Sequence, residues 1–222
     1  MSETAQADRF TNQRSLIIAT AGHVDHGKSS LVNKITGIET DTLREEKERG
    51  LSINLGYAYY YFPSIEPDAA TENIIGFVDV PGHADFINNM LAGIGTVDYA
   101  LLVIAADDGI MPQTREHLSI LDLLGISKAV IALTKIDTCN AERINTVSDE
   151  IAELLSSTCL NTAPIFPVSS LSGDGFDALI EFLQNTLQEK KSDEALQQTH
   201  KPRFLIDRSF SVKGIGTVVT GS

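Results

Sequence analysis

Eight consecutive residues, Gly22 to Ser29, restrict the fold more than any other feature of this 222-residue sequence. They read GHVDHGKS, which fits the pattern GxxxxGK[ST], and they stand between the apolar run 16–21 and the amphipathic stretch 28–35. A strand, a glycine-rich turn and a helix in this order form a phosphate-binding loop, because glycines let backbone N–H groups curve around phosphate oxygens at a helix N-terminus. We therefore predict an α/β domain that binds a nucleotide.

The loop residues divide the work of phosphate binding. Lys28 should reach the β- and γ-phosphates and stabilise charge during catalysis, and the Ser29 hydroxyl should bind Mg²⁺. The residues that we expect to contact the nucleotide here are Gly22, His23, Val24, Asp25, His26, Gly27, Lys28, Ser29 and Ser30. The alternative, a fortuitous glycine-rich turn, is made less favourable by the predicted strand before it and helix after it.

The rest of the chain alternates β-rich runs with amphipathic helical patterns. The further predicted strands are 53–62, 74–79, 100–106, 129–134 and 164–168. The further predicted helices are 112–124, 141–155 and 176–187. The strands 53–62 and 74–79 should pair as a hairpin, and the remaining alternation predicts a mostly parallel, doubly wound sheet with helices on both faces. Ligands then bind at the carboxyl ends of the strands.

Changes in composition predict the domain boundaries. Residues 1–14 are polar and are expected to form a disordered tail, and residues 15–189 should form the nucleotide-binding domain. The charged stretch 190–202 is interpreted as a linker, with an extension of the last helix as the alternative. Residues 203–222 have the pattern of a β-hairpin. Two strands cannot form a core, so we expect the start of a β-barrel domain in a partial sequence.

A second motif, Asp79-Val80-Pro81-Gly82-His83, ends the predicted strand 74–79 with the pattern DxxG. An aspartate at this strand end can hold Mg²⁺ through a water ligand, and the Gly82 amide can bond a γ-phosphate oxygen. His83 occupies the place of the residue that orients the attacking water in a GTPase. The alternative for His83 is a surface histidine in a loop.

The segment Thr134-Lys135-Ile136-Asp137, which fits [NT]KxD, selects the base. An aspartate accepts hydrogen bonds from N1–H and the exocyclic amine of guanine, whereas adenine offers no such donor pair. The stem of Lys135 should lie along the base, and Thr134 belongs to the same loop. A backbone amide for guanine O6 should come from Ser169, Ser170 and Leu171. The expected ligands are GTP and GDP.

The loop Arg49-Gly50-Leu51-Ser52-Ile53 supplies the last predicted contact. In GTPases a hydroxyl in this loop meets Mg²⁺ and the γ-phosphate, so that the loop orders with GTP and loosens after hydrolysis. Ser52 therefore completes the predicted metal set with Ser29 and Asp79. The alternative is a solvent-facing serine at the start of a strand.

Composition excludes several other classes of protein. The 30 acidic and 17 basic residues give a formal charge of −13, which disfavours broad nucleic-acid binding through phosphate neutralisation. No apolar run approaches the roughly 20 residues of a membrane span, and residues 1–14 lack the pattern of a signal peptide. Cys139 and Cys159 have no metal-ligand spacing. We expect a cytoplasmic protein without membrane contact.

The segments GHVDHGKS, DVPGH and RGLSIN resemble the translational GTPases, a family that includes elongation factor Tu, over roughly residues 15–188. The phrases TGI, DTLREEK, LGYAY and IDRSFSVKG are more similar to the selenocysteine-specific elongation factors. The compact loop before Arg49 also fits that branch. Two departures are Ser52, where the family usually has threonine, and Thr134, where many GTPases carry asparagine.

This resemblance implies a monomeric factor that delivers selenocysteinyl-tRNA to the ribosome and hydrolyses GTP by in-line attack of water. It also implies that the ribosome moves His83 towards the γ-phosphate, past the screening side chains of Val24 and Leu51. Asp25 would help to hold a monovalent ion. The hairpin of a selenoprotein mRNA would be bound only through a C-terminal region that this sequence lacks.

Three alternatives remain open at this point. The first is a general aminoacyl-tRNA carrier of the elongation factor Tu type, or an initiation-factor subunit, with the same chemistry and another tRNA. The second is a metabolic GTPase, such as the regulatory subunit of a sulfate-activating enzyme. The third is a nucleotide-gated binding module with negligible turnover.

Overall fold

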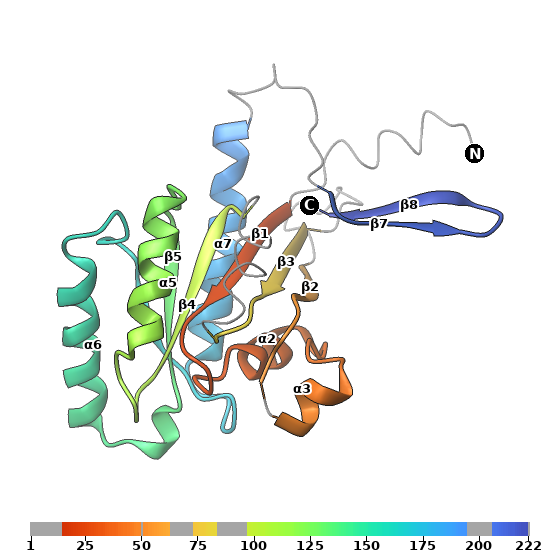
Figure 1. Cartoon of the computed structure of the whole chain (residues 1–222). Coiled ribbons are helices and arrows are strands. Elements are labelled where there is room, and N and C mark those ends of the chain that lie inside the picture. Colours follow the sequence, from red (N-terminus) through yellow and green to blue (C-terminus); the bar gives the residue numbers. More distant parts are fainter. Residues whose placement is uncertain (1–14, 50, 63–72, 84–96, 195–205, 222) are drawn as a thin grey trace. The chain divides into compact units, whose positions relative to one another are not determined.

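The computed structural model describes residues 15–49, 51–62, 73–83, 97–194 and 206–221 (Figure 1). The chain divides into two compact units, Met1–Gln188 and Glu189–Ser222, which are described separately here. The predicted N-terminal tail and residues 195–202 of the predicted linker lie outside the described residues.

Six strands form one sheet in the order β2-β3-β1-β4-β5-β6. In chain order they are β1 (Ser15–Ala21), β2 (Gly56–Phe62), β3 (Asn73–Asp79), β4 (Tyr99–Ala105), β5 (Ala129–Thr134) and β6 (Ile165–Pro167). Strands β2 and β3 are antiparallel, with Gly56 opposite Asp79, and the other neighbouring pairs are parallel. The mostly parallel sheet with one antiparallel pair is confirmed.

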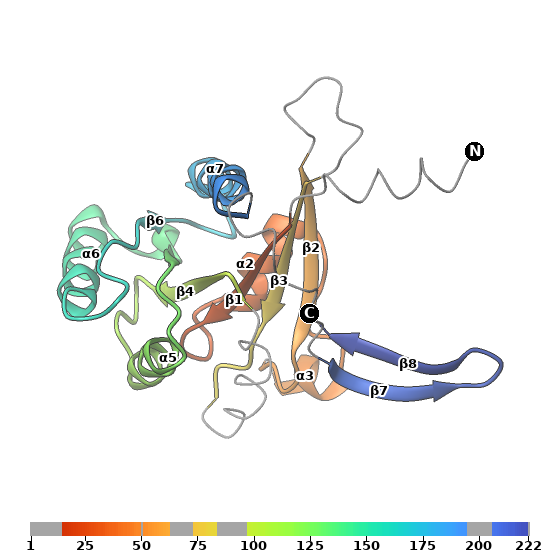
Figure 2. The ribbon, with the colours of Figure 1, turned by 90° about the horizontal axis from the view of Figure 1, so that it is seen from above.

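Helices cover both faces of this sheet (Figure 2). The helices on one face are α2 (Lys28–Thr36) and α7 (Phe176–Glu194). Those on the other face are α5 (Pro112–Leu123) and α6 (Ala141–Leu155). Helix α7 was predicted to end at Leu187 and continues to Glu194, into the stretch interpreted as a linker. The short helices α3 (Arg44–Arg49) and η2 (Ile136–Thr138) were not predicted.

Strand β4 illustrates how the sequence divides the core between the two faces. Leu101 and Val103 pack towards α2 and α7, and Leu102 and Ile104 pack towards α5 and α6, all fully buried. Successive side chains of a strand point to opposite faces, so a strand covered on both sides must be continuously apolar. Each such buried side chain stabilises the fold by about 1.5–3 kcal/mol. The result is a rigid platform for the loops at the strand ends.

Local signals set where the helices begin and end. Gly27 and Gly37 flank α2 in the left-handed conformation, and the Gly37 amide donates to the Asn33 carbonyl oxygen at 2.7 Å. Proline at the first position opens α5, and the Asn140 side chain caps α6 by accepting from the Arg143 amide at 2.8 Å. Because only the loop 22–27 separates α2 from the end of β1, the free N–H groups of its first turn lie at the carboxyl edge of the sheet.

The second unit contains an antiparallel pair, β7 (Ile206–Val212) and β8 (Gly216–Gly221), as predicted for this segment. Gly214 in the turn and Gly216, the first residue of β8, have φ of 88° and 104°, a conformation that favours glycine. That these strands open a β-barrel domain stays a prediction. In the described part of the chain, no helix is long and apolar enough to cross a membrane.

Candidate nucleotide-binding site

The phosphate loop between β1 and α2 contains three residues with positive φ, two of which are glycines. Gly22, Asp25 and Gly27 have φ of 135°, 64° and 85°. A Cβ atom at Gly22 would lie 2.2 Å from the Val103 carbonyl oxygen, so a larger residue cannot replace this glycine. The loop is therefore pressed against strand β4.

His117, on α5, anchors the start of this loop. The Gly22 amide donates to His117 Nδ1 at 2.8 Å, across 95 residues of sequence. His117 is buried, and this burial, together with the positive charge of Lys28 and neighbouring His23, lowers its pKa to about 4. The ring is therefore neutral at pH 7 and can accept. Sequence reasoning missed His117, because its only sequence signal is a place on the buried face of an amphipathic helix.

His26 joins the loop to the core rather than presenting its ring to a ligand. Its side chain is fully buried, with Nδ1 3.3 Å from the Val103 carbonyl oxygen, and desolvation lowers its pKa to about 4. The Thr134 hydroxyl donates to the His26 carbonyl oxygen at 2.7 Å. Threonine thus links the base loop to the phosphate loop, so the absence of asparagine at this position leaves the link in place.

Lys28 lies inside the phosphate loop. Its Nζ donates to the carbonyl oxygens of His23 at 2.8 Å and of Gly22 at 3.2 Å. Burial lowers its pKa to about 8, while the carboxylates of Asp79, Asp25 and Asp41 raise it. The ammonium group is thus held against the backbone of the phosphate loop and beside the pocket, which suits a β- or γ-phosphate.

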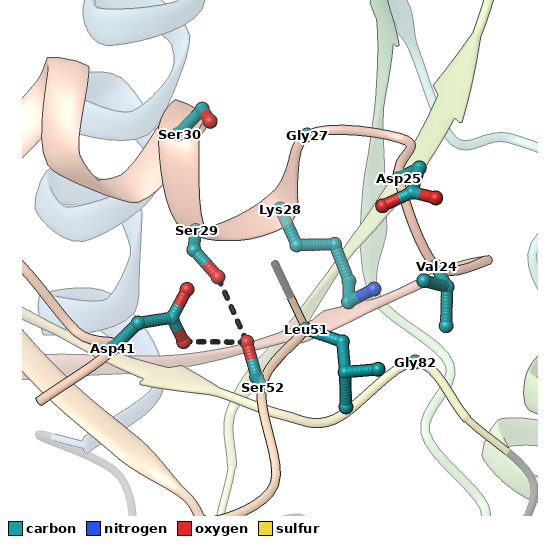
Figure 3. A pocket seen from close by; sticks show the side chains of 10 residues that line it. All are labelled: Val24, Asp25, Gly27, Lys28, Ser29, Ser30, Asp41, Leu51, Ser52 and Gly82. Atoms are coloured by element: carbon teal, nitrogen blue, oxygen red, sulfur yellow. Dashed lines mark hydrogen bonds between the residues drawn. The ribbon is translucent and has the colours of Figure 1, made fainter. Parts of the chain in front are cut away.

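A pocket of about 210 Å³ opens beside Lys28 (Figure 3). It is lined by Val24, Asp25, Gly27, Lys28, Ser29, Ser30, Asp41, Leu51, Ser52 and Gly82. The Ser52 hydroxyl donates to Asp41 Oδ1 at 2.7 Å and lies 3.0 Å from the Ser29 hydroxyl oxygen. The structure therefore brings the two hydroxyls predicted to bind Mg²⁺ together, and it adds Asp41, which sequence reasoning missed.

Asp79 is fixed behind this pair of hydroxyls. Its two carboxylate oxygens accept from the hydroxyls of Thr20 at 2.8 Å and Thr40 at 2.6 Å. Burial raises its pKa, and these hydrogen bonds and that of Ser29 act in the opposite direction. Serine hydroxyls and carboxylates form the all-oxygen surroundings that Mg²⁺ prefers, with several positions left for phosphate and water. The residues present fit a magnesium ion.

Gly82 packs directly on the phosphate loop, and its lack of a side chain makes this possible. A Cβ atom there would lie 2.4 Å from Lys28 Nζ and 2.8 Å from the Val24 amide nitrogen. Figure 3 shows Val24 and Leu51 beside Gly82 at the rim of the pocket. His83 follows Gly82 and is half-buried, but among the described residues it does not line this pocket.

The base end of the site is built from the loops after β5 and β6. The Ser169 hydroxyl donates to Asp137 Oδ1, and Lys135, at φ of 57°, places Nζ 3.4 Å from Asp107 Oδ2. Arg143 holds the neighbouring loop by donating to the Ala106 and Asp107 carbonyl oxygens at 3.0 and 3.1 Å. Arg143 belongs to no motif that sequence reasoning recognised.

A second pocket, of about 460 Å³, connects the two ends of the site. It is lined by Ser29, Ser30, Asn33, Lys34, Glu39, Asp41, Ser170 and Leu171. Ser29, Ser30 and Asp41 also line the first pocket. A ligand with phosphates on Lys28 can therefore extend towards Ser170 and the base loop.

Known proteins are similar to this chain over most of its length. The family model of the elongation factor Tu GTP binding domain matches residues 13–189. The selenocysteine-specific elongation factor of Escherichia coli strain K12 is 49% identical over 207 residues, covering 93% of this chain and 32% of that protein. Its counterpart from Desulfomicrobium baculatum is 44% identical, covering 93% and 31%. Translation initiation factor 2 subunit gamma of Thermococcus kodakarensis is 38% identical, covering 92% and 53%.

Solved structures of elongation factors also match this chain. A bacterial selenocysteine-specific elongation factor, EF-Sec, matches with a TM-score of 0.79 and 41% identity, covering 94% of this chain and 34% of that one. Elongation factor SelB from Methanococcus maripaludis, in complex with the GTP analogue GppNHp, matches with a TM-score of 0.72 and 28% identity, covering 94% and 41%. The chain spans about a third of the length of the first curated relatives that it matches.

Proposed function

Because the chain belongs to the elongation factor Tu GTP-binding domain family, and is a GTPase domain of a translation elongation factor, we propose that it serves the delivery of selenocysteinyl-tRNA to the ribosome. The selenocysteine-specific relatives are 44–49% identical to it, whereas the gamma subunits of initiation factor 2 are 38% identical. Neither a general tRNA carrier nor a metabolic GTPase is favoured by these relatives.

The observation that carries the GTPase assignment is the first pocket. Lys28, Ser29, Ser52 and Gly82 come from three separate segments and line the same space. Each is the residue type that a nucleoside triphosphate requires at that place: an ammonium for phosphate charge, hydroxyls for a metal, and a backbone amide for the γ-phosphate.

The bound metal would be held by the hydroxyls of Ser29 and Ser52, with Asp79 acting through a water ligand. Asp41 accepts from Ser52 and so orients its hydroxyl oxygen. When bound, Mg²⁺ supplies positive charge that offsets the charge on the phosphates.

The protein groups supply binding, orientation and protection from water. Lys28 and the loop amides bind the β- and γ-phosphates, and the Gly82 amide bonds a γ-phosphate oxygen. Val24 and Leu51, at the rim of the pocket, keep His83 away from the attacking water until the ribosome moves it inward. His83 then orients that water for in-line attack. Asp137, oriented by Ser169, selects guanine over adenine.

The proposal extends to the remaining parts and partners. Residues 195–202, after α7, link the GTPase domain to a β-barrel domain that begins near residue 203, and the full-length protein would bind selenocysteinyl-tRNA as a monomer. A further C-terminal region would bind the hairpin of a selenoprotein mRNA. A factor that acts on ribosomes works in the cytoplasm.

His83→Ala tests the catalytic part of the proposal in the full-length protein. GTP binding should stay within about twofold of wild type, because His83 does not line the pocket. Hydrolysis stimulated by ribosomes should fall by about a thousandfold or more, as expected for loss of the group that orients the nucleophile. Single-turnover hydrolysis, with and without ribosomes, measures both rates. Undiminished stimulation would remove His83 from this role.

The tRNA is tested separately, by competition between selenocysteinyl-, seryl- and other aminoacyl-tRNAs for the GTP-bound full-length protein. We expect selenocysteinyl-tRNA to displace the others. Equal binding of all aminoacyl-tRNAs would favour the general carrier and leave the GTPase assignment intact.

A further inference from the structure

Glu46, in the short helix α3, has an unusual set of hydrogen bonds for a glutamate in a surface loop. Its side chain is 3% exposed. One carboxylate oxygen, Oε2, accepts from the Leu43 amide at 2.8 Å, and the other, Oε1, accepts from the amides of Ile53 and Asn54, both at 3.1 Å. The Leu51 amide also donates to the Glu46 carbonyl oxygen at 3.2 Å. One residue therefore joins the two arms of the loop between α2 and β2.

The carboxylate of Glu46 is ionised at neutral pH despite its burial. Burial by itself raises the pKa of the carboxyl, but the amides of Asn54, Leu43, Ile53 and Thr42 donate to it and bring the pKa below its usual range. Backbone donors favour the charged form of a carboxyl group. Glu46 thus acts as a permanent acceptor for the loop.

The two arms that Glu46 joins carry residues of the phosphate pocket. Asp41 precedes α3, and Leu51 and Ser52 follow it, and all three line the pocket. Apart from the hydrogen bonds of Glu46, the loop is also fixed at Thr40. The Thr40 hydroxyl donates to Asp79 Oδ2, and the Thr40 Cβ leaves no room for a side chain at Gly56. The position of Leu51 and Ser52 over the phosphate loop therefore depends on the bonds made by Glu46.

We propose that Glu46 is a positioning residue that holds Leu51 and Ser52 at the γ-phosphate side of the pocket and thereby strengthens the binding of GTP relative to that of GDP. This inference rests on the proposed function. Leu51 lies beside Gly82, and the Ser52 hydroxyl lies 3.0 Å from that of Ser29 (Figure 3). In the proposed function Gly82 bonds the γ-phosphate, so a ligand that ends at the β-phosphate depends less on this side of the pocket. GDP binding should not require the hydrogen bonds that Glu46 accepts.

The test compares Glu46→Ala and Glu46→Gln by calorimetry on the full chain, with GDP and with a non-hydrolysable GTP analogue in magnesium buffer. Glu46→Ala should weaken binding of the analogue about tenfold, as for loss of charge-assisted hydrogen bonds, and leave GDP within about twofold. Glu46→Gln keeps one acceptor oxygen, so it should restore binding to within about threefold of wild type. Glu45→Ala, at the adjacent exposed position, is the matched control and should change neither affinity.

A double-mutant cycle with Ser52→Ala separates positioning from general stability. If Glu46 acts through Ser52, adding Glu46→Ala to Ser52→Ala should weaken the analogue by less than about twofold more. Equal weakening of GDP and analogue, or fully additive effects, would overturn the inference. If Glu46→Ala does not fold, Glu46→Gln takes its place in the test. A loss of affinity for the analogue without a loss for GDP then supports the inference, and equal affinity changes for both nucleotides overturn it. Absence of guanine-nucleotide binding by the wild-type chain would instead contradict the proposed function itself.

Discussion

The phosphate end and the base end of the site differ in how deeply their polar residues are buried. At the phosphate end, Lys28, His26 and His117 are at most 6% exposed and are bonded to backbone groups of the phosphate loop or of strand β4. At the base end, Asp137 is exposed, and Lys135 pairs with Asp107 and with Asp108, both more than a third exposed. The residues of the first end are buried polar groups beside the hydrophobic core, and those of the second are largely exposed.

This difference separates stability from selectivity. Changes at the phosphate end alter buried polar groups, whose desolvation enters the stability of the fold as well as the affinity for phosphate. Changes at the base end alter exposed groups and should affect the choice of base with little effect on folding. Thr134 joins the two ends through the His26 carbonyl oxygen.

The largest effect is expected for Lys28→Met, which keeps the apolar stem and removes the charge. Loss of several charge-assisted hydrogen bonds to phosphate should weaken both GTP and GDP by about a thousandfold. The free energy of unfolding without nucleotide should not fall, because burial already disfavours this ammonium and lowers its pKa to about 8. Calorimetry and urea unfolding measure the two quantities. Affinity within tenfold of wild type would contradict the role of Lys28.

Asp137→Asn should break the base end alone. We expect GTP affinity to fall about a hundredfold, since a buried pair of guanine donors then loses its carboxylate acceptor, and xanthine nucleotides to become preferred. Unfolding without nucleotide should change by less than about 0.5 kcal/mol, as for an exposed residue. Asp149→Asn, on an exposed position of α6, is the control. Unchanged GTP affinity would refute the base assignment.

The smallest expected effect is the pH dependence of the free energy of unfolding, which tests the burial of His117 at the phosphate end. His117 has a pKa of about 4 in the folded protein, against 6.5 without burial. The unfolded chain therefore binds more protons between these values, and stability falls as pH falls from 6.5 towards 4. This histidine alone should remove about 2 kcal/mol between pH 7 and pH 5.

His117→Gln offers the Gly22 amide an acceptor that does not titrate. We expect this variant to lose about 2 kcal/mol less stability than wild type between pH 7 and pH 5, with urea unfolding at both values as the measurement. An unchanged pH dependence would show that His117 is not held neutral in the folded state.

Local patterns in the sequence predicted the sheet, its helices and most of the pocket. The phosphate loop, Ser52, Gly82 and Asp137 could be recognised because each stands in a short motif next to a strand. Val24 and Leu51, which the resemblance to translational GTPases implies as the residues that screen His83, both line the pocket, and their screening role stays a prediction.

Contacts between distant segments could not be predicted in this way. His117 meets Gly22 across 95 residues, and Thr20 meets Asp79 across 59, and neither His117 nor Thr20 belongs to a motif. The charged run that forms α3 has no apolar period that would predict a helix. Glu46 is nevertheless buried there, because its carboxylate accepts hydrogen bonds from backbone amides. Helix α7 continues beyond its last core residue, Leu187, through lysine and glutamate, which are good helix formers without an apolar signal.

The proposed function requires that guanine nucleotides bind between the phosphate loop and Asp137. Calorimetry of the folded chain in magnesium buffer, with GTP, GDP and ATP at equal concentrations, tests this directly. We predict heats of binding for GTP and GDP and none for ATP. No heat with either guanine nucleotide, or a preference for ATP, would contradict the account.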